Sequence, residues 1–299
     1  MTDRTPHVVT DSEALRAAVA AARGAGKSIG LVPTMGALHA GHLSLVDVSA
    51  AQCGLTVVTI FVNPTQFAPG EDFERYPRTL ERDVALLAGR GADLVFAPPA
   101  DSIYRPGHAT RVEVDRVTAE FEGRCRPGHF SGVATIVLKL LQLAAPDIAF
   151  FGQKDFQQCV VIRRMAADLD VPCAIRMLPT VRESDGLAMS SRNAYLSAQQ
   201  RQQALGVIRA LRSAAALAAD GERRAEPIIR RMRETLRAAG LEPIDYAALV
   251  EPQELAPIQE ITGPTLALIA AHAGRTRLID NLLFGPDGRE LAIGEVAGV

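Results

Sequence analysis

The sequence predicts an α/β protein, with a doubly wound, Rossmann-like parallel sheet in its N-terminal domain and a smaller α+β domain at its C-terminal end. Five short apolar runs alternate with segments of helical period over the first 180 or so residues, which is the pattern of repeated βαβ units. These runs are apolar on both faces, as strands of a covered parallel sheet are. After about residue 181, runs of helix are followed by runs of strand, which is typical of an α+β domain.

The expected elements follow in chain order. Strands of the first domain are predicted at 28–34, 55–63, 92–98, 147–153 and 172–180, and its crossover helices at 43–53, 79–91, 133–145 and 155–169. The second domain is predicted to have helices at 197–220 and 225–240 and strands at 244–250, 265–273 and 276–284. We therefore divide the chain into domains 1–180 and 181–299. The tail after Phe284 is either a disordered end or a strand-like extension.

Composition excludes several classes of protein. A net charge of −2 and a pI near 6.3 give no general attraction for nucleic acid or an anionic membrane surface. No stretch reaches the roughly 18 apolar residues that span a bilayer, and no basic leader precedes an apolar run at the N-terminus. The four cysteines lack zinc-site spacing: Cys53, Cys125, Cys159 and Cys173. We expect reduced thiols in a cytoplasmic protein that binds neither nucleic acid nor membrane.

Two histidines stand at a predicted junction between strand and helix. The stretch PTMGALHAGHLSLV, residues 33–46, contains His39 and His42. In an open α/β sheet, ligands bind beyond the carboxyl ends of the strands, where helix N-termini point their free N–H groups. Two imidazoles three residues apart can lie over the same ligand atoms, and Gly36 and Gly41 permit close approach of the backbone. This segment is therefore predicted to bind phosphate.

Other interpretations of the histidine pair are open at this point. A single loop histidine is more often satisfied within the protein or exposed to solvent than functional. The HxxH spacing also suits zinc, but no third ligand lies nearby in the sequence. The stretch contains neither GxGxxG nor GxxxxGK[ST], so it is neither a dinucleotide fingerprint nor a P-loop.

Two more segments place polar groups after predicted strands. FVNPTQF puts Asn63 and Gln66 at the carboxyl edge of the sheet, where amides can hydrogen-bond a carboxylate or hydroxyl without burying a charge; NPTQ is also a common turn sequence. FGQKDFQQ offers Lys154 as a mobile charge for phosphate. Its Asp155 could accept a hydrogen bond from a ribose hydroxyl, or act only as a helix cap.

Four blocks together resemble one family. HxGH, within residues 33–46, is the signature of the nucleotidylyl transferase superfamily. With FVNPTQF, FGQKDFQQ and DGLAMSSRN (185–193), the sequence resembles the pantothenate synthetases, or pantoate-β-alanine ligases, over nearly the whole chain to about residue 284. The resemblance implies ATP-dependent condensation of (R)-pantoate with β-alanine to pantothenate. It also implies a pantoyl adenylate intermediate, release of AMP and pyrophosphate, a requirement for Mg²⁺, and a homodimer formed through the first domain.

The resemblance also implies the residues of the site. Those expected to act in catalysis are His42, His39, Lys154 and Arg192. Gln66 is expected to contact both pantoate and β-alanine, and Gln158 to contact pantoate. Asn63 is a further substrate-binding candidate from its place after a predicted strand. Those expected to contact ATP are Met35, Gly36, Ala37, Leu38, His39, Ala40, Gly41, His42, Gly152, Gln153, Lys154, Asp155, Val181, Met189, Ser190, Ser191 and Arg192. No metal ligand is identified.

GLAMSSRN looks like this family's version of the KMSKS loop. Ala188 stands where the first lysine of that loop would be, so the positive charge rests on Arg192. A serine-rich linker between domains is the alternative interpretation. Two other segments carry candidate groups whose roles we leave open. GRCRPGHFSGV offers Arg124, Arg126 and His129, in a segment that the resemblance places near the site and the dimer contact. EDFERYPRTLERD offers Tyr76 and Asp83 as candidate pocket or metal-linked groups.

The predicted chemistry must bring a carboxylate to a triphosphate. Two unit charges about 4 Å apart repel by roughly 4 kcal/mol at an effective dielectric constant near 20, so the positive groups and helix N-termini are needed to offset them. A mixed anhydride hydrolyses in an open site, so we expect residues 181–299 to act as a lid hinged near 181–186. Another nucleotidylyl transferase, a non-catalytic nucleotide sensor and an HxxH metal hydrolase are the competing functions.

Overall fold

The computed structural model describes residues 5–296, which fold as two compact units. Among these residues, unit 1 comprises 5–152 and 161–178, and unit 2 comprises 153–160 and 179–296. The short segment 153–160 thus belongs with the C-terminal part of the chain. The division at 180/181 and the lid stay predictions about independent folding and motion.

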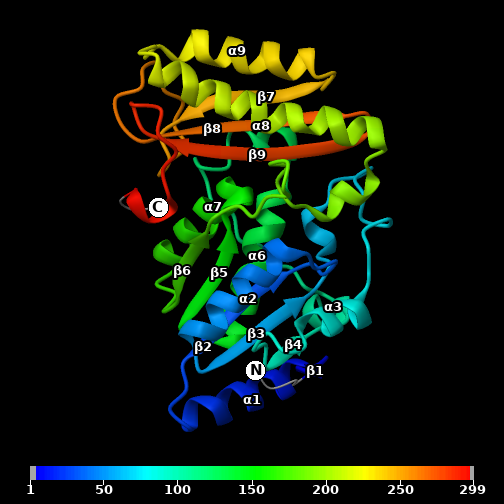
Figure 1. Cartoon of the computed structure of the whole chain (residues 1–299). Coiled ribbons are helices and arrows are strands. Elements are labelled where there is room, and N and C mark those ends of the chain that lie inside the picture. Colours follow the sequence, from blue (N-terminus) through cyan, green and yellow to red (C-terminus); the bar gives the residue numbers. More distant parts are fainter. Residues whose placement is uncertain (1–4, 297–299) are drawn as a thin grey trace. The chain divides into compact units, whose positions relative to one another are not determined.

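Unit 1 is built on a six-stranded parallel sheet (Figure 1), which confirms the predicted fold class. The strands lie in the order β1-β4-β3-β2-β5-β6. Their bounds are His7–Val9 (β1), Ile29–Thr34 (β2), Leu55–Ile60 (β3), Leu94–Phe96 (β4), Ile148–Gly152 (β5) and Ala174–Leu178 (β6). The predicted elements omitted β1, a three-residue strand at the edge of the sheet.

Seven helices accompany the sheet in the described part of the chain. They are α1 (Ser12–Gly24), α2 (Ala40–Gln52), α3 (Leu80–Leu87), α4 (Ala100–Ile103), α5 (Glu122–Cys125), α6 (His129–Ala144) and α7 (Phe156–Asp168), of which α7 is shared between the units. Leu43 and Val46 of α2 pack with Val32, Val58 and Phe150 of the strands in one buried core. Removing such side chains from water is the main favourable term in holding α2 on the sheet.

Strands β2 and β5 are neighbours at the centre of the sheet. The chain order reverses direction across this pair, because β3 and β4 lie on one side of β2 and β5 and β6 on the other. Ligands of open α/β sheets bind at such a switch point, beyond the carboxyl ends of the strands. The loop that follows β2 begins at Met35 and ends at His39, and His42 lies in the first turn of the helix α2 that follows it.

Unit 2 has a three-stranded antiparallel sheet in the order β7-β8-β9, with two helices on one face (Figure 1). The bounds are Ala198–Ala219 (α8), Ala225–Ala238 (α9), Ile244–Val250 (β7), Thr265–Ala273 (β8) and Thr276–Phe284 (β9). All three strands match their predicted bounds. The tail after Phe284 forms an isolated bridge between Phe284 and Glu290, then a short 3₁₀ turn at Ile293–Glu295. Within residues 5–296, no helix has the length and apolar character needed to cross a membrane.

Candidate active site

His39 and His42 lie at the first turn of α2. His39 is the N-cap residue, with extended backbone angles, and both histidines are half-buried. Their ring centroids are 4.1 Å apart. The apolar pattern predicted that this helix begins at Leu43. The structure has α2 begin three residues earlier, at Ala40, directly after its N-cap residue His39. The two imidazoles lie together at the positive end of the helix dipole.

The hydrogen bonds of the two rings assign their tautomers. His39 Nδ1 accepts from the Gly41 N–H at 3.2 Å, and His42 Nδ1 accepts from the His39 N–H at 3.4 Å. A backbone N–H can only donate, so both Nδ1 atoms are unprotonated and each neutral ring carries its proton on Nε2. Each histidine is thus an Nε2–H donor, which suits an anionic oxygen.

The loop before α2 is held in an unusual conformation by Asp83 of α3. Gly36 and Ala37 have φ values of 80° and 50°, in the left-handed region that costs a residue with a Cβ about 1 kcal/mol or more. The fully buried Asp83 carboxylate accepts from the Ala37 N–H at 2.9 Å and the Leu38 N–H at 2.8 Å. The candidate role left open for Asp83 is therefore structural: it fixes the backbone that leads to His39.

Replacing Asp83 with asparagine is expected to loosen this loop. Asparagine has one side-chain acceptor in place of two, and its NH₂ group would face a backbone N–H. We expect a loss of about 1–3 kcal/mol in the free energy of unfolding, measured by urea denaturation, and a higher KM for ATP. Asp47→Asn, which removes only an exposed ion pair with Arg90, is the matched control and should change stability by less than about 1 kcal/mol. Equal effects of the two variants would contradict the role of Asp83.

Asn63 uses all of its hydrogen-bonding capacity within unit 1. Its side chain, 1% exposed, follows β3 at the start of the 3₁₀ turn η1 (Pro64–Gln66). Asn63 Oδ1 accepts from the Thr65 N–H (3.3 Å), the Thr65 hydroxyl (2.9 Å) and the Tyr104 hydroxyl (2.9 Å). Asn63 Nδ2 donates to Gly132 O (3.1 Å) and Gln66 Oε1 (3.0 Å). The Thr65 N–H can only donate and the Gly132 carbonyl can only accept, so the orientation of this amide is fixed.

Asn63 in turn fixes the amide of Gln66. Because Gln66 Oε1 faces the donor of Asn63, Gln66 Nε2 faces the Met35 sulfur at 2.9 Å. A thioether is a weak acceptor, and an amide nitrogen carries two protons. Gln66 therefore presents an N–H toward the histidine loop, and Asn63 acts by orienting it. That Asn63 and Gln66 contact a substrate stays a prediction. The structure gives the two side chains different tasks, since Gln66 presents the N–H group and Asn63 orients it.

Arg126 and His129 hold the backbone of Gln66. Arg126 makes a two-point ion pair with Glu71, at 2.6 and 2.7 Å, and donates to His129 Nε2 at 3.1 Å and to Gln66 O at 3.3 Å. Since a guanidinium only donates, His129 Nε2 accepts and its Nδ1–H donates to Gln66 O at 2.8 Å. These residues, whose roles the sequence left open, are structural supports of the Gln66 segment. Arg124 instead makes an exposed ion pair with Glu120.

Acidification is expected to destabilise the protein through His129. Burial, and second the Arg126 charge, lower the pKa of His129 to about 4 from 6.5, although Gln66 O, Glu122 and Glu71 oppose the shift. Between these values the unfolded chain binds a proton that the folded chain does not. The free energy of unfolding is thus fully retained above pH 6.5 and falls by up to about 3 kcal/mol as the pH drops toward 4.

This effect is measured as the urea midpoint of wild type and His129→Asn between about pH 7.5 and 4.5. The variant should show the shallower dependence, since its side chain does not titrate. Equal slopes in the two proteins would contradict the assignment.

Lys154 and Asp155 lie in unit 2, in the 3₁₀ turn η2 (Gln153–Asp155). Lys154 Nζ lies 3.5 Å from Asp155 Oδ1, and the lysine side chain is 19% exposed. Asn281 of β9, 2% exposed, donates to the carbonyls of Gln153 and Lys154 at 2.9 Å each and accepts from Gln153 Nε2 at 3.2 Å. The sequence analysis missed Asn281. Its signal was an amide in the otherwise apolar run NLLF.

The residues expected to bind adenosine are also organised by β9. The Met189 N–H donates to Val181 O at 3.0 Å, which brings these two candidates together. Arg182, next to Val181, makes a two-point ion pair with the buried Asp280, at 2.6 and 3.2 Å. Neighbouring residues of one strand, Asp280 and Asn281, thus anchor both predicted nucleotide segments of unit 2.

The serine-rich turn is fixed at its start and at its end. Ser190 Oγ accepts from the Arg192 N–H at 3.3 Å, which caps the 3₁₀ turn η3 (Ser191–Tyr195). Asn193 Nδ2 donates to Glu183 Oε1 at 3.1 Å, and Arg201 of α8 pairs with the other oxygen of Glu183 at 2.7 Å. This segment is therefore a folded turn. Arg192 is half-buried within it.

The predicted site residues are divided between the units. Unit 1 brings the histidine loop next to Gln66 and Asn63, and also contains Gly152. Unit 2 contains the other candidates, including the half-buried Gln158 of α7. Tyr76, a candidate pocket residue, is buried and packs edge-on against Phe67, with ring centroids 5.9 Å apart. No cluster of three or more His, Cys, Asp or Glu side chains suited to a metal ion occurs in the described part of the chain.

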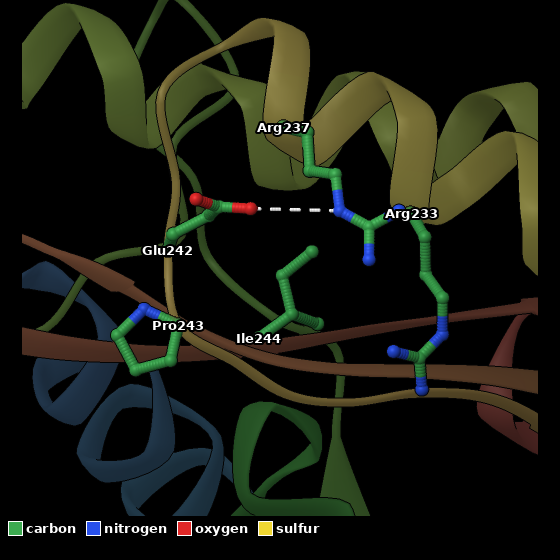
Figure 2. Close-up of a pocket in the computed structure, with 5 residues that line it drawn as sticks. All are labelled: Arg233, Arg237, Glu242, Pro243 and Ile244. Carbon is green, nitrogen blue, oxygen red and sulfur yellow. Dashed lines mark ion pairs between the residues drawn. The ribbon is translucent and has the colours of Figure 1, made fainter.

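A cavity of about 470 Å³ lies elsewhere in unit 2 (Figure 2). It is lined by Arg233 and Arg237 of α9 and by Glu242, Pro243 and Ile244 at the start of β7. Arg237 Nε lies 3.5 Å from Glu242 Oε1, and both side chains are exposed. None of the predicted site residues lines this cavity.

Comparison with known proteins places these observations in a family. Residues 7–283 match the family described as pantoate-beta-alanine ligase. The chain is 51% identical to the pantothenate synthetase of Moorella thermoacetica over 271 residues, which cover 91% of this chain and 96% of that protein. It is 50% identical to the pantothenate synthetase of Rhizorhabdus wittichii over 279 residues, covering 93% and 99%.

Two solved structures of pantothenate synthetases or pantoate-beta-alanine ligases have a fold similar to that of this chain. A crystal structure of pantothenate synthetase from Thermus thermophilus superposes with a TM-score of 0.88 at 46% identity, covering 92% of this chain and 98% of that one. A pantoate-beta-alanine ligase from Francisella tularensis, complexed with beta-gamma ATP and beta-alanine, gives a TM-score of 0.77 at 32% identity, covering 94% and 99%.

Proposed function

Because the chain belongs to the pantoate-beta-alanine ligase family, it is an ATP-dependent enzyme that condenses pantoate with β-alanine, and we propose that it does so through a pantoyl adenylate. The observation that carries this proposal is the pair of Nε2–H donors, His39 and His42, at the N-terminus of α2 beside the switch point of the sheet. Donors fixed in advance at a helix N-terminus stabilise charge that develops on phosphate oxygens.

In the first step, a carboxylate oxygen of pantoate attacks the α-phosphorus of ATP. The bond from that phosphorus to the bridging oxygen breaks, and pyrophosphate leaves. His42, with His39 as its partner, donates to the phosphate oxygens, while Lys154 and Arg192 offset the negative charge that opposes the approach. Gln66 binds pantoate through its Nε2–H, as the fixed orientation of its amide allows.

In the second step, the amine of β-alanine attacks the acyl carbon of the adenylate. The carbon–oxygen bond to AMP breaks, AMP leaves, and the nitrogen loses a proton as the amide forms. No nucleophile from the protein is needed, so the task of the site is orientation. We assign Gln66 and Gln158 to the substrates and residues 152–155, Val181 and Met189–Arg192 to ATP.

Mg²⁺ is part of the proposal as an ion that arrives with ATP. The described residues offer no complete ligand set of their own, and Mg²⁺ in ATP-dependent enzymes commonly keeps its bonds to substrate phosphates and water. When bound there, it neutralises charge on the pyrophosphate leaving group. We also propose, from the family resemblance alone, that the chain acts in the cytoplasm as a homodimer.

The test is AMP release from ATP, Mg²⁺ and (R)-pantoate, with and without β-alanine, using pantoate that carries ¹⁸O at both carboxylate oxygens. We expect AMP formation to depend on pantoate and to accelerate with β-alanine, and one ¹⁸O atom to appear in each AMP. Unlabelled AMP would overturn the adenylate intermediate. ATP binding without turnover, under every acid and amine tried, would overturn the ligase function and favour a nucleotide sensor.

A further inference from the structure

Helix α6 approaches the η1 turn so closely that only glycine fits between them. A Cβ atom on Gly132 would lie 2.3 Å from Thr65 O, 2.5 Å from Thr65 C and 2.7 Å from Gln66 N. All three are backbone atoms, so the segment itself would have to move. Gly132 lies in the first turn of α6, with an ordinary helical conformation, so this is a requirement for space and not for a special φ value.

The same turn of α6 also makes the polar contacts that fix this segment. Gly132 O accepts from Asn63 Nδ2 at 3.1 Å, and His129 Nδ1 donates to Gln66 O at 2.8 Å. Contacts before and after the point of close approach therefore set both the distance and the rotation of the Gln66 segment. Strand β3 ends at Ile60, so the sheet does not position Gln66 directly.

We propose that Gly132 is a positioning residue that sets the depth of Gln66 in the pantoate site. This inference rests on the proposed function, because Gln66 is the group that binds pantoate there. A side chain at position 132 displaces the η1 turn toward the ligand and turns the Gln66 N–H away from the substrate oxygen. Met35 is the expected ATP contact that faces the Gln66 amide, through its sulfur at 2.9 Å, and the other expected ATP contacts lie in other segments, so we expect the larger effect on pantoate.

The test is the Gly132→Ala variant, assayed by pantoate-dependent AMP formation. We expect the KM for pantoate to rise by about 10- to 100-fold, as a misplacement near 1 Å produces, while the KM for ATP changes less than about twofold. Gly24→Ala is the matched control, since Gly24 also lies in a helix and its Cβ would meet nothing within 4 Å. It should leave both KM values unchanged.

A wild-type protein that forms no AMP with pantoate overturns the proposed function, whereas an active wild type with an unchanged pantoate KM in Gly132→Ala overturns this inference alone. Equal rises in both KM values would indicate general damage and also overturn it. If Gly132→Ala gives no folded protein, His129→Leu and His129→Asn decide. A raised pantoate KM in His129→Leu that His129→Asn restores supports the positioning of Gln66 by α6; equal KM values in both overturn it.

Discussion

Replacing Gln66 with glutamate is expected to raise the KM for pantoate by about 10³-fold. The substitution keeps the shape of the side chain, and Asn63 can still donate to one carboxylate oxygen as it does to Gln66 Oε1. The other oxygen takes the place of the Nε2–H donor and faces the pantoate carboxylate. Two unit charges about 4 Å apart repel by roughly 4 kcal/mol at an effective dielectric constant near 20, and each 1.4 kcal/mol is a factor of ten.

The control for this variant is Gln66→Met, which removes the donor without adding a charge. We expect it to lose the hydrogen bond alone, which to a charged partner is worth about 1.5–3 kcal/mol, or roughly 10- to 150-fold in KM. The ratio of the pantoate KM values of the two variants then measures the repulsion between the introduced carboxylate and that of pantoate. A glutamate variant no worse than the methionine variant would mean that the Gln66 amide does not face the carboxylate.

Replacing His42 with alanine is expected to lower kcat by about 10²- to 10³-fold, as the loss of one donor to a developing anion does. The reason is the tautomer. His42 Nδ1 is occupied by the His39 N–H, so the proton available to a phosphate oxygen is on Nε2. Glutamine places an amide N–H near the position of Nε2, whereas asparagine places it near Nδ1, so His42→Gln should retain more activity than His42→Asn.

Steady-state kcat at saturating ATP, pantoate and β-alanine checks this order. His7→Ala is the control, since His7 is an exposed residue of the edge strand β1. Near-normal kcat in His42→Ala would contradict the catalytic role. A rate in His42→Asn above that in His42→Gln would leave the role in place and overturn the assigned tautomer.

The parts of the fold that the sequence predicted are those with local signals. The strands that precede Met35, Phe61 and Gln153 were predicted from apolar runs. A strand covered on both faces is apolar along its length, so it can be recognised from its own residues. The helix starts were less well predicted. α2 starts directly after His39, whose ring accepts from the Gly41 N–H, and α6 starts at His129 after Gly128 in the left-handed conformation. An apolar pattern contains neither of these signals.

The support of the site could not be predicted, because its contacts join residues far apart in the chain. Asp83 binds a loop 45 and 46 residues before it, and Gly132 O lies 69 residues from the Asn63 amide that it binds. The sequence suggested that Asp83, Arg126 and His129 were polar groups near the site. It could not indicate that they bind backbone atoms of other site segments rather than substrate.

The bonds between β9 and the η2 turn have a consequence for how the protein is made. Ribosomal synthesis proceeds from the N-terminus, so the Lys154 segment emerges long before Asn281, which lies 127 residues later and binds its carbonyl. Until the last long strand has left the ribosome, the carbonyls of Gln153 and Lys154 have no amide from β9 to bind. The lysine that faces the nucleotide in our proposal thus acquires its final support among the last events of synthesis. A nascent chain that stalls before β9 would carry the histidine loop without the two Asn281 hydrogen bonds to the Lys154 segment.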